Sequence, residues 1–422
     1  MKFAGLKIGG WRQFEEIDIK FSPRVTIITG ANGAGKSTIL RILGQHFGWN
    51  SQMLRTPVVE SGGITKYFSG IFNRRPKLAP QPPPSATQDE IGTVSYSNSG
   101  VGQIVIPRDG SVQYNIQIVN RNPIDGLFIQ SHRPVQNYQQ VNHIPTNVVA
   151  AEQAYQQYRG ELVNRYNNGH SQFGPIYRMK EALISMATFG PGNQNVAGNP
   201  ETERLYKGFE EVLRKVLPKD LGFRHLSVRI PDVVMATNTG DFVVDAASGG
   251  LMSLVDLAWQ IFLYSRDREE FVVIIDEPEN HLHPSMQRTI IESMISAFPQ
   301  AQFVIATHSP FIVSSVRDAA VYVLRYNVVV DEEIGPVRHR TVSSVLLDQV
   351  SKAGTASDIL RDALGVPVTI PIWAEAEIRN IAADFSINNL TEESLDSLKV
   401  RLAAAGLSEF YPDAVRQVAK NQ

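Results

Sequence analysis

One stretch near the start constrains the fold of this chain more than any other: Gly30-Ala31-Asn32-Gly33-Ala34-Gly35-Lys36-Ser37-Thr38, which fits the pattern G-x-x-x-x-G-K-[ST]. Residues 24–29 before it are rich enough in β-branched side chains for a buried strand, and the apolar spacing of residues 39–43 predicts a helix. A strand, a glycine turn and a helix start direct backbone N–H groups and the positive end of the helix dipole toward one point. The sequence therefore predicts a phosphate-binding loop.

The residue types in this loop predict how it would hold a nucleotide. Lys36 would reach the β- and γ-phosphates, Ser37 would offer its hydroxyl to Mg²⁺, and Thr38 lies close enough to bond a phosphate oxygen. A glycine-rich loop that holds no phosphate is the alternative, which the flanking strand and helix disfavour. The candidate nucleotide-binding residues are Asn32, Gly33, Ala34, Gly35, Lys36, Ser37 and Thr38.

A second stretch places two acids at the end of an apolar strand. Residues 271–275 are all apolar and predict a strand that is buried on both faces, and Asp276 and Glu277 follow directly. Open α/β sheets bind ligands at this end of their strands. Asp276 would hold Mg²⁺ through the water shell of the ion, and Glu277 would orient or deprotonate the attacking water. A strand that ends in solvated acids is the alternative, which a nearby phosphate-binding loop disfavours.

Three further features are weaker when each is taken alone. Gln130 follows a short apolar strand, where it can reach a metal or a water near the phosphates. His308 follows another strand, where it can hydrogen-bond a γ-phosphate and sense its departure. The Ser248-Gly249-Gly250 turn opens a helix and is either a second anion-binding corner or an ordinary N-cap. His281 and His283 have no third ligand nearby, which favours a structural or interface role over a metal site.

The composition of the chain limits the class of protein in which these motifs occur. The 422 residues are 43% hydrophobic and 19% charged, which is typical of a globular chain and not of a disordered one. The formal net charge of -2 gives no global attraction to nucleic acid or anionic lipid, and the absence of cysteine excludes disulfides and thiolate metal sites. Because the sequence has no signal-peptide pattern and no long apolar run, we expect a cytoplasmic protein that does not contact a membrane.

These features resemble, in chain order, the sequence elements of ABC-type ATPases. The phosphate loop resembles the Walker A motif, Gln130 the Q-loop and the Ser248-Gly249-Gly250 turn the signature motif. Asp276-Glu277 resembles the Walker B motif, and His308 resembles the switch histidine. This resemblance covers residues 1–325. More narrowly, residues 30–33, 276–284 and 306–310 resemble those of soluble ABC ATPases related to RecF, SMC and OLD proteins, many of which serve bacterial anti-phage systems.

The resemblance implies a P-loop ATPase that uses ATP and Mg²⁺. The metal would be held by Ser37, Gln130 and Asp276, and the catalytic residues would be Glu277 and His308. The Ser248, Gly249 and Gly250 corner of a second chain would close on the γ-phosphate. ATP would thus join two heads into a homodimer or a higher oligomer, and hydrolysis would part them.

The pattern along the chain, read with this resemblance, predicts an α/β fold with a mixed or parallel central sheet and four regions. An N-terminal ATPase lobe with an antiparallel β subdomain would span 1–145, a helical insertion 146–220, a C-terminal ATPase lobe 221–340 and a helical tail 341–422. Within these, residues 91–118 predict a small antiparallel sheet over one side of the nucleotide, residues 320–330 predict edge strands, and residues 76–90 predict a proline-rich loop.

Two functions stay open at this point. The chain resembles the ATPase subunit of Septu, PARIS or certain retron systems, a sensor or scaffold that would regulate a separate effector, a nuclease or a toxin. The alternative is a RecF- or SMC-like ATPase that works on DNA in repair or recombination. Candidate phosphate contacts to nucleic acid are basic clusters that solvated faces explain more often: Arg74-Arg75, Arg214-Lys215 and Arg338-His339-Arg340.

Overall fold

The structure is a computed structural model of the chain. It describes residues 1–50, 52–59, 65–69, 87–108, 110–131, 138–146, 149–330, 338–348, 356–362, 371–385 and 391–420. The chain divides into two compact units, Met1–Ile359 and Leu360–Gln422. Among the described helices, none is long and apolar enough to cross a membrane.

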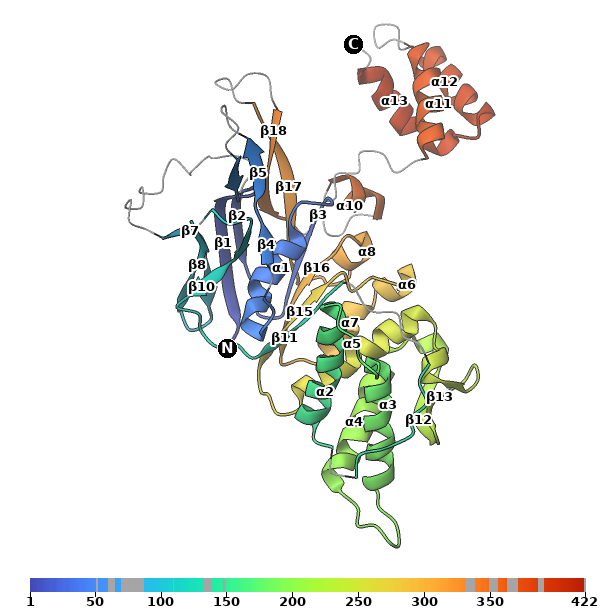
Figure 1. The fold of residues 1–422 in the computed structure, drawn as a ribbon. Coiled ribbons are helices and arrows are strands. Elements are labelled where there is room, and N and C mark those ends of the chain that lie inside the picture. The colour runs from blue at the N-terminus through green and yellow to red at the C-terminus, as the bar shows by residue number, and fades with distance from the viewer. Residues whose placement is uncertain are drawn as a thin grey trace. The chain divides into compact units, whose positions relative to one another are not determined.

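The first unit is built on an 11-stranded sheet (Figure 1). In spatial order its strands are β10 (Gln117–Val119), β8 (Val101–Pro107), β7 (Gln88–Tyr96), β1 (Phe3–Trp11), β2 (Phe14–Lys20), β18 (Arg338–Leu346), β17 (Ala320–Val330), β3 (Val25–Gly30), β16 (Ala301–Ala306), β15 (Phe271–Asp276) and β11 (Gly126–Ile129). Strands β17, β3, β16, β15 and β11 run parallel, whereas β10, β8, β7, β1 and β2 pair antiparallel. The predicted α/β class with a mixed central sheet is confirmed.

The parallel strands form the centre of the core. Every residue of β3, β15 and β16 is buried, as the apolar run of residues 271–275 and the β-branched side chains of residues 24–29 predict for β15 and β3. Helix α1 (Lys36–Gly44) packs against all three of these strands and continues into the short helix η1 (Gln45–Phe47). Helix α5 (Gly249–Ser265) packs against β11.

Within its described residues, the predicted helical insertion contains the α-helices α2 (Ala151–Tyr166), α3 (Pro175–Phe189) and α4 (Pro200–Val216). Proline in the first turn starts α3 and α4, and the Asn199 side chain caps α4 by accepting from the N–H groups of Glu201 and Thr202. Helices α2 and α4 both pack against α5. The insertion is therefore anchored on the helix that opens with the Ser248 turn.

The remaining elements of the first unit are short. Three small sheets comprise β12 (Phe223–Arg229), β13 (Asp232–Thr237) and β14 (Phe242–Val243), then β4 (Gln52–Leu54) with β9 (Gln113–Asn115), and β5 (Thr56–Val59) with β6 (Thr65–Phe68). The helices are η2 (Lys219–Leu221), η3 (Val244–Ala246), α6 (Pro284–Gln287), α7 (Ile290–Ala297), α8 (Pro310–Val313) and α10 (Ala356–Asp362), the last of which crosses the boundary between the units.

The described residues of the second unit are mostly helical, as predicted for that part of the tail. It contains α11 (Ile372–Ala383), α12 (Glu392–Ala404), η5 (Ser408–Phe410) and α13 (Tyr411–Lys420). Thr391 and Ser394 form a capping box at the start of α12, and Leu398 and Leu402 on its inner face are fully buried. These leucines join residues of α11 and α13 in a core of their own.

Three predictions about the sheet are wrong. Strand β17 is not an edge strand, because β3 and β18 pair with it on either side. Residues 341–346 are not helical but lie in β18, where their hydroxyl groups find partners on neighbouring strands, as in the 2.6 Å bond from Thr341 to Glu15. The strands within residues 91–118 do not form a sheet of their own, because β7 pairs with β1 and thereby joins the main sheet.

The predicted proline-rich loop can be judged only in part. Residues 88–90 belong to β7, and residues 76–86 lie outside the described residues. Arg74 and Arg75 also lie outside them.

Candidate active site

The phosphate-loop sequence forms a tight turn between β3 and α1. Gly30 and Gly35 have φ values of +139° and +102°, which side chains disfavour. A Cβ at Gly35 would lie 2.4 Å from the Phe14 ring, and one at Gly30 would lie 2.5 Å from the Leu324 carbonyl oxygen. The pattern therefore needs glycine here both for the backbone conformation and for the close approach of β2 and β17.

Lys36 begins α1 and folds back over this turn. Its Nζ donates to the carbonyl oxygens of Gly30 at 2.9 Å and Ala31 at 3.1 Å, and it lies 3.3 Å from Nδ1 of His308. Burial lowers the pKa of Lys36 to about 8, although the carboxylates of Glu277 and Asp276 oppose that shift. The loop lysine is thus held between the end of β3 and the histidine that follows β16.

The strand register brings the separate motifs to one edge of the sheet. Ala306 pairs with both Ile28 and Asp276, so the ends of β3, β15 and β16 are level. On the far side of β15, Ile129 pairs with Ile275, so Gln130 follows at the level of Asp276. Residues far apart in the sequence therefore meet where parallel sheets place their ligands.

Asp276 has the features of a metal-binding carboxylate. It is 4% exposed, and its Oδ1 is buried without a hydrogen-bond partner. Burial raises the pKa of Asp276 to about 6, and a hydrogen bond from Ser37 opposes the shift. A buried carboxylate oxygen that lacks a donor is costly unless a cation or water satisfies it, so Asp276 and Ser37 fit a Mg²⁺ site.

Glu277 follows this carboxylate in the chain and lies close to His308. Its φ of +50° is uncommon for a residue other than glycine, and its backbone N–H donates to Ala306 at 2.9 Å. One carboxylate oxygen lies 3.7 Å from Nε2 of His308, and the other accepts from the Asn280 amide at 3.1 Å. Burial, together with the nearby Lys36, lowers the pKa of His308, which therefore favours the neutral ring.

The sequence analysis missed Glu279. Its Oε1 accepts from the Thr307 hydroxyl at 2.7 Å and from the backbone N–H groups of His308 at 2.7 Å and Ser309 at 3.2 Å. Burial raises the pKa of Glu279, and these donors oppose the shift. Glu279 therefore fixes the backbone that carries His308. In the sequence, Glu279 is visible only as a third acid after the apolar strand. Its spacing does not indicate which groups it would bind.

The Ser248 turn lies at the start of α5 and next to the loop after β15. Ser248 is exposed and caps the helix by accepting from the Leu251 N–H at 3.4 Å, as the ordinary N-cap alternative predicts. A Cβ on Gly250 would lie 2.9 Å from the His281 carbonyl oxygen. His283 has a structural contact, because its Nδ1 accepts from the Ser285 N–H at the start of α6.

The described basic clusters have contacts within the chain. Arg214 donates to the Arg224 carbonyl at 3.0 Å, and Lys215 donates to the Ser296 carbonyl at 3.5 Å. Arg340 is exposed, while the side chains of Arg338 and His339 lie outside the described residues. Contact with nucleic acid stays a prediction.

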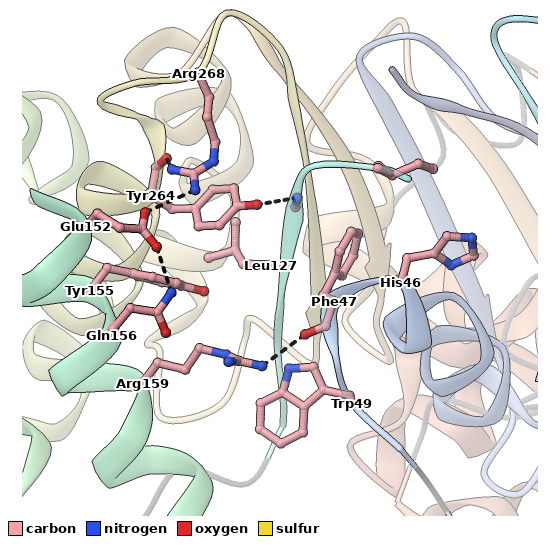
Figure 2. Close-up of a pocket in the computed structure, with 12 residues that line it drawn as sticks. His46, Phe47, Trp49, Leu127, Glu152, Tyr155, Gln156, Arg159, Tyr264 and Arg268 are labelled. Carbon is pink, nitrogen blue, oxygen red and sulfur yellow. Dashed lines mark hydrogen bonds and ion pairs between the residues drawn. The ribbon is translucent and has the colours of Figure 1, made fainter. Parts of the chain in front are cut away.

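A cavity of about 190 Å³ lies at the far ends of the elements that carry the motifs. Its lining includes Phe47 after α1, Gly126 at the start of β11 and Tyr264 near the end of α5, and Figure 2 shows Arg159 of α2 directed toward Phe47. Arg159 of α2 donates to the Phe47 carbonyl at 2.9 Å, and Tyr264 accepts from the Gly126 N–H at 2.6 Å. The first bond joins the helical insertion to η1, and the second joins α5 to the sheet.

Comparisons with known proteins match the two halves of this site. The family described as "AAA domain" matches residues 5–133, which contain the phosphate loop and Gln130. The family described as "AAA domain, putative AbiEii toxin, Type IV TA system" matches residues 236–314, which contain the Ser248 turn, Asp276, Glu277 and His308.

Two relatives and one solved structure show the extent of the similarity. The "Retron Vc95 probable ATPase" of Vibrio cholerae serotype O1 biovar El Tor is 38% identical over 53 residues, which are 13% of this chain and only 10% of that protein. The Septu protein PtuA of Bacillus thuringiensis is 25% identical over 389 residues, 88% of this chain and 86% of that protein. The Smc head bound to the C-winged helix domain of ScpA aligns with a TM-score of 0.45 at 16% identity, over 83% of this chain and 100% of that one.

The chain is therefore related to the retron ATPases and to Septu protein PtuA, as the sequence analysis predicted. It also carries matches to AAA domains on both sides of the helical insertion.

Proposed function

We propose that this protein binds and hydrolyses ATP at the edge where β3, β15 and β16 end. The observation that carries the proposal is the chain of contacts from Lys36 through His308 to Glu277, beside the buried Asp276. A loop lysine, a metal-binding carboxylate and a second carboxylate are the groups that phosphoryl transfer to water requires.

Each residue of the proposed ATP site has a role that follows from its position. Residues 32–38 would cradle the phosphates, with the Lys36 ammonium on the β- and γ-phosphates in place of its present contacts with loop carbonyls. Mg²⁺, held by Ser37, Asp276 and Gln130, would neutralise charge that develops on the phosphate oxygens. Glu277 would orient the attacking water and accept its proton, and His308 would hydrogen-bond the γ-phosphate.

We extend the proposal to a dimer that closes on the nucleotide. Ser248 and Gly249 are exposed at the N-terminus of α5, so the turn is accessible to a second copy. Its contact with the loop after β15 would connect a neighbour's γ-phosphate with this chain's own acidic strand. Such a contact exists only with the triphosphate, which gives ATP and ADP different effects on assembly.

The similarity to PtuA and to retron ATPases supports a defence role in which this protein is the sensor or scaffold for a separate effector. A cycling ATPase that acts on DNA is the alternative. The two functions differ in what a hydrolysis-deficient protein does.

The first prediction tests the site and the role together. Lys36→Ala should abolish ATP binding, because it removes the cation that faces the phosphates, whereas Glu277→Gln should keep binding and lower kcat by roughly a hundredfold or more. For each variant, titration with ATP and Mg²⁺ measures binding, the turnover rate gives kcat, and light scattering measures assembly. We expect Glu277→Gln to accumulate as an ATP-bound dimer or larger assembly.

Lys207→Ala, which removes an exposed lysine paired with Glu203 on α4, is the matched control and should behave like the unaltered protein. If Lys36→Ala binds ATP normally, the proposed site is wrong. If Glu277→Gln still supports effector control in cells, the scaffold is favoured; loss of all function favours the cycling ATPase.

A further inference from the structure

Asn280 lies in the turn after β15 and has hydrogen bonds to three separate parts of the site. Its Nδ2 donates to Glu277 Oε2 at 3.1 Å and to the Ser131 carbonyl at 3.1 Å. Its own carbonyl accepts from the Ser253 hydroxyl at 3.2 Å. One partly buried side chain and its carbonyl thus connect the acidic strand with the residue after Gln130 and with α5.

The backbone around Asn280 keeps these contacts close. The Asn280 N–H donates to the Glu277 carbonyl at 3.2 Å, which closes the turn, and His281 has a φ of +68°. Directly after the turn, the His281 carbonyl packs so near Gly250 that a Cβ there would lie 2.9 Å away. The turn is therefore pressed against the first turns of α5, and Asn280 has few alternative positions.

The amide group suits this position better than other side chains do. Its two N–H bonds serve a carboxylate and a carbonyl at once, and both are acceptors. An Asp at this position would place a carboxylate, which only accepts hydrogen bonds, against the Glu277 carboxylate and the Ser131 carbonyl. An Ala would leave Glu277 Oε2 without its described donor. Glu277 itself has an exposed side-chain fraction of 31%, so without Asn280 its carboxylate keeps the 3.7 Å approach to His308 but loses the hydrogen bond that fixes its other oxygen.

We infer that Asn280 is a positioning residue, which holds the Glu277 carboxylate in its reactive orientation by tying it to the backbone after Gln130 and to the helix that begins at the Ser248 turn. This inference rests on the proposed ATPase function. It adds that the water-orienting acid, the Gln130 segment and the Ser248 helix move as one connected unit.

A double-mutant cycle tests whether Asn280 acts through Glu277. Asn280→Ala should lower single-turnover ATP hydrolysis by roughly tenfold to a hundredfold, the worth of a hydrogen bond to a charged group, while ATP affinity changes less than about threefold. In a Glu277→Gln background the same substitution should have almost no further effect on the rate. A residue that only stabilises the fold would lower both rates by the same factor.

Two other variants keep the test decisive. Asn280→Asp has nearly the same shape, so it replaces Asn280→Ala if that variant unfolds, and it should show the same loss of rate. Asn327→Ala is the matched control: Asn327 also donates its amide within the sheet, to Ser343 at 3.0 Å, and its loss should leave hydrolysis unchanged.

Equal losses in both backgrounds, or no loss from Asn280→Ala and Asn280→Asp, would overturn the inference and leave the proposed function intact. If Glu277→Gln alone hydrolyses ATP at the normal rate, the proposed function fails, and the inference fails with it.

Discussion

Asp276 is a buried carboxylate whose charge affects the stability of the fold. Its carboxylate is shielded from water, and one oxygen lacks a donor, so the charged form is disfavoured in the protein without ligand. Its pKa rises from 3.8 to about 6 on folding. Between these values the folded state binds more protons than the unfolded one, so the free energy of unfolding falls as the pH rises through this window.

Asp276→Asn should therefore stabilise the ligand-free protein at neutral pH, by on the order of 1–3 kcal/mol, while it abolishes hydrolysis with Mg²⁺. The stability gain should shrink as the pH falls from 6 toward 4, because the wild-type carboxyl then becomes protonated. Thermal unfolding at several pH values, without nucleotide or metal, measures this. A variant that is less stable than the wild type at pH 7 would contradict the assigned environment.

Among the elements, those with strong local signals were predictable from sequence and those that depend on partners were not. The strands β3, β15 and β16 and the glycine turn can be recognised within their own segments, because strands that are buried on both faces consist mostly of apolar and β-branched residues. Strand β18 contains Ser343 and Ser344, whose polar side chains interrupt the apolar alternation and whose hydroxyls bond to neighbouring strands. A pattern within one segment does not contain that information.

The candidate site divides in the same way. Lys36, Asp276, Glu277 and His308 were expected together and do lie at one sheet edge, because parallel strands align their carboxyl ends. The contacts of Glu279 and Asn280 were not predicted, since they depend on which backbone groups of other segments the turn after β15 meets. The roles of all these residues in catalysis stay predictions.

The contact between α2 and the residues that follow α1 gives a prediction at the scale of elements. Arg159→Ala removes the bond to the Phe47 carbonyl and the contact with the Trp49 ring, whose centroid lies 5.8 Å from the guanidinium carbon. We expect a loss of about 1–2 kcal/mol of stability and a weaker dependence of unfolding on bound ATP.

Arg165→Ala on the same helix is the control, because its 3.5 Å contact with the Phe173 carbonyl stays within the insertion. Chemical denaturation with and without ATP compares the two. Equal effects of both substitutions would show that the contact with Phe47 has no special importance.

At the scale of the whole molecule, the chain contains two units with separate cores. The first holds all the residues assigned to the nucleotide. The second is a small helical unit whose core includes Leu398 and Leu402, both fully buried. Because a small core has little stability to spare, single substitutions there should have large local effects.

Leu398→Ala should cost the second unit about 2–5 kcal/mol and leave the ATP affinity of the first unit unchanged. Hydrogen exchange across residues 371–420, together with ATP titration, measures both. Val400→Ala on the same helix is the control, since Val400 is 68% exposed. A loss of ATP affinity in Leu398→Ala alone would mean that the two units are energetically coupled.

The position of β3 between β16 and β17 has a consequence for biosynthesis. During synthesis the phosphate loop, which ends at Thr38, is made well before the strands that flank β3, which are complete only at residues 306 and 330. Pairings so distant in sequence form slowly, because a long loop must close before any of them stabilises the chain. The residues predicted to bind the nucleotide are therefore synthesised long before the strands that hold them in place, and β3 stays unpaired and open to aggregation until late in translation.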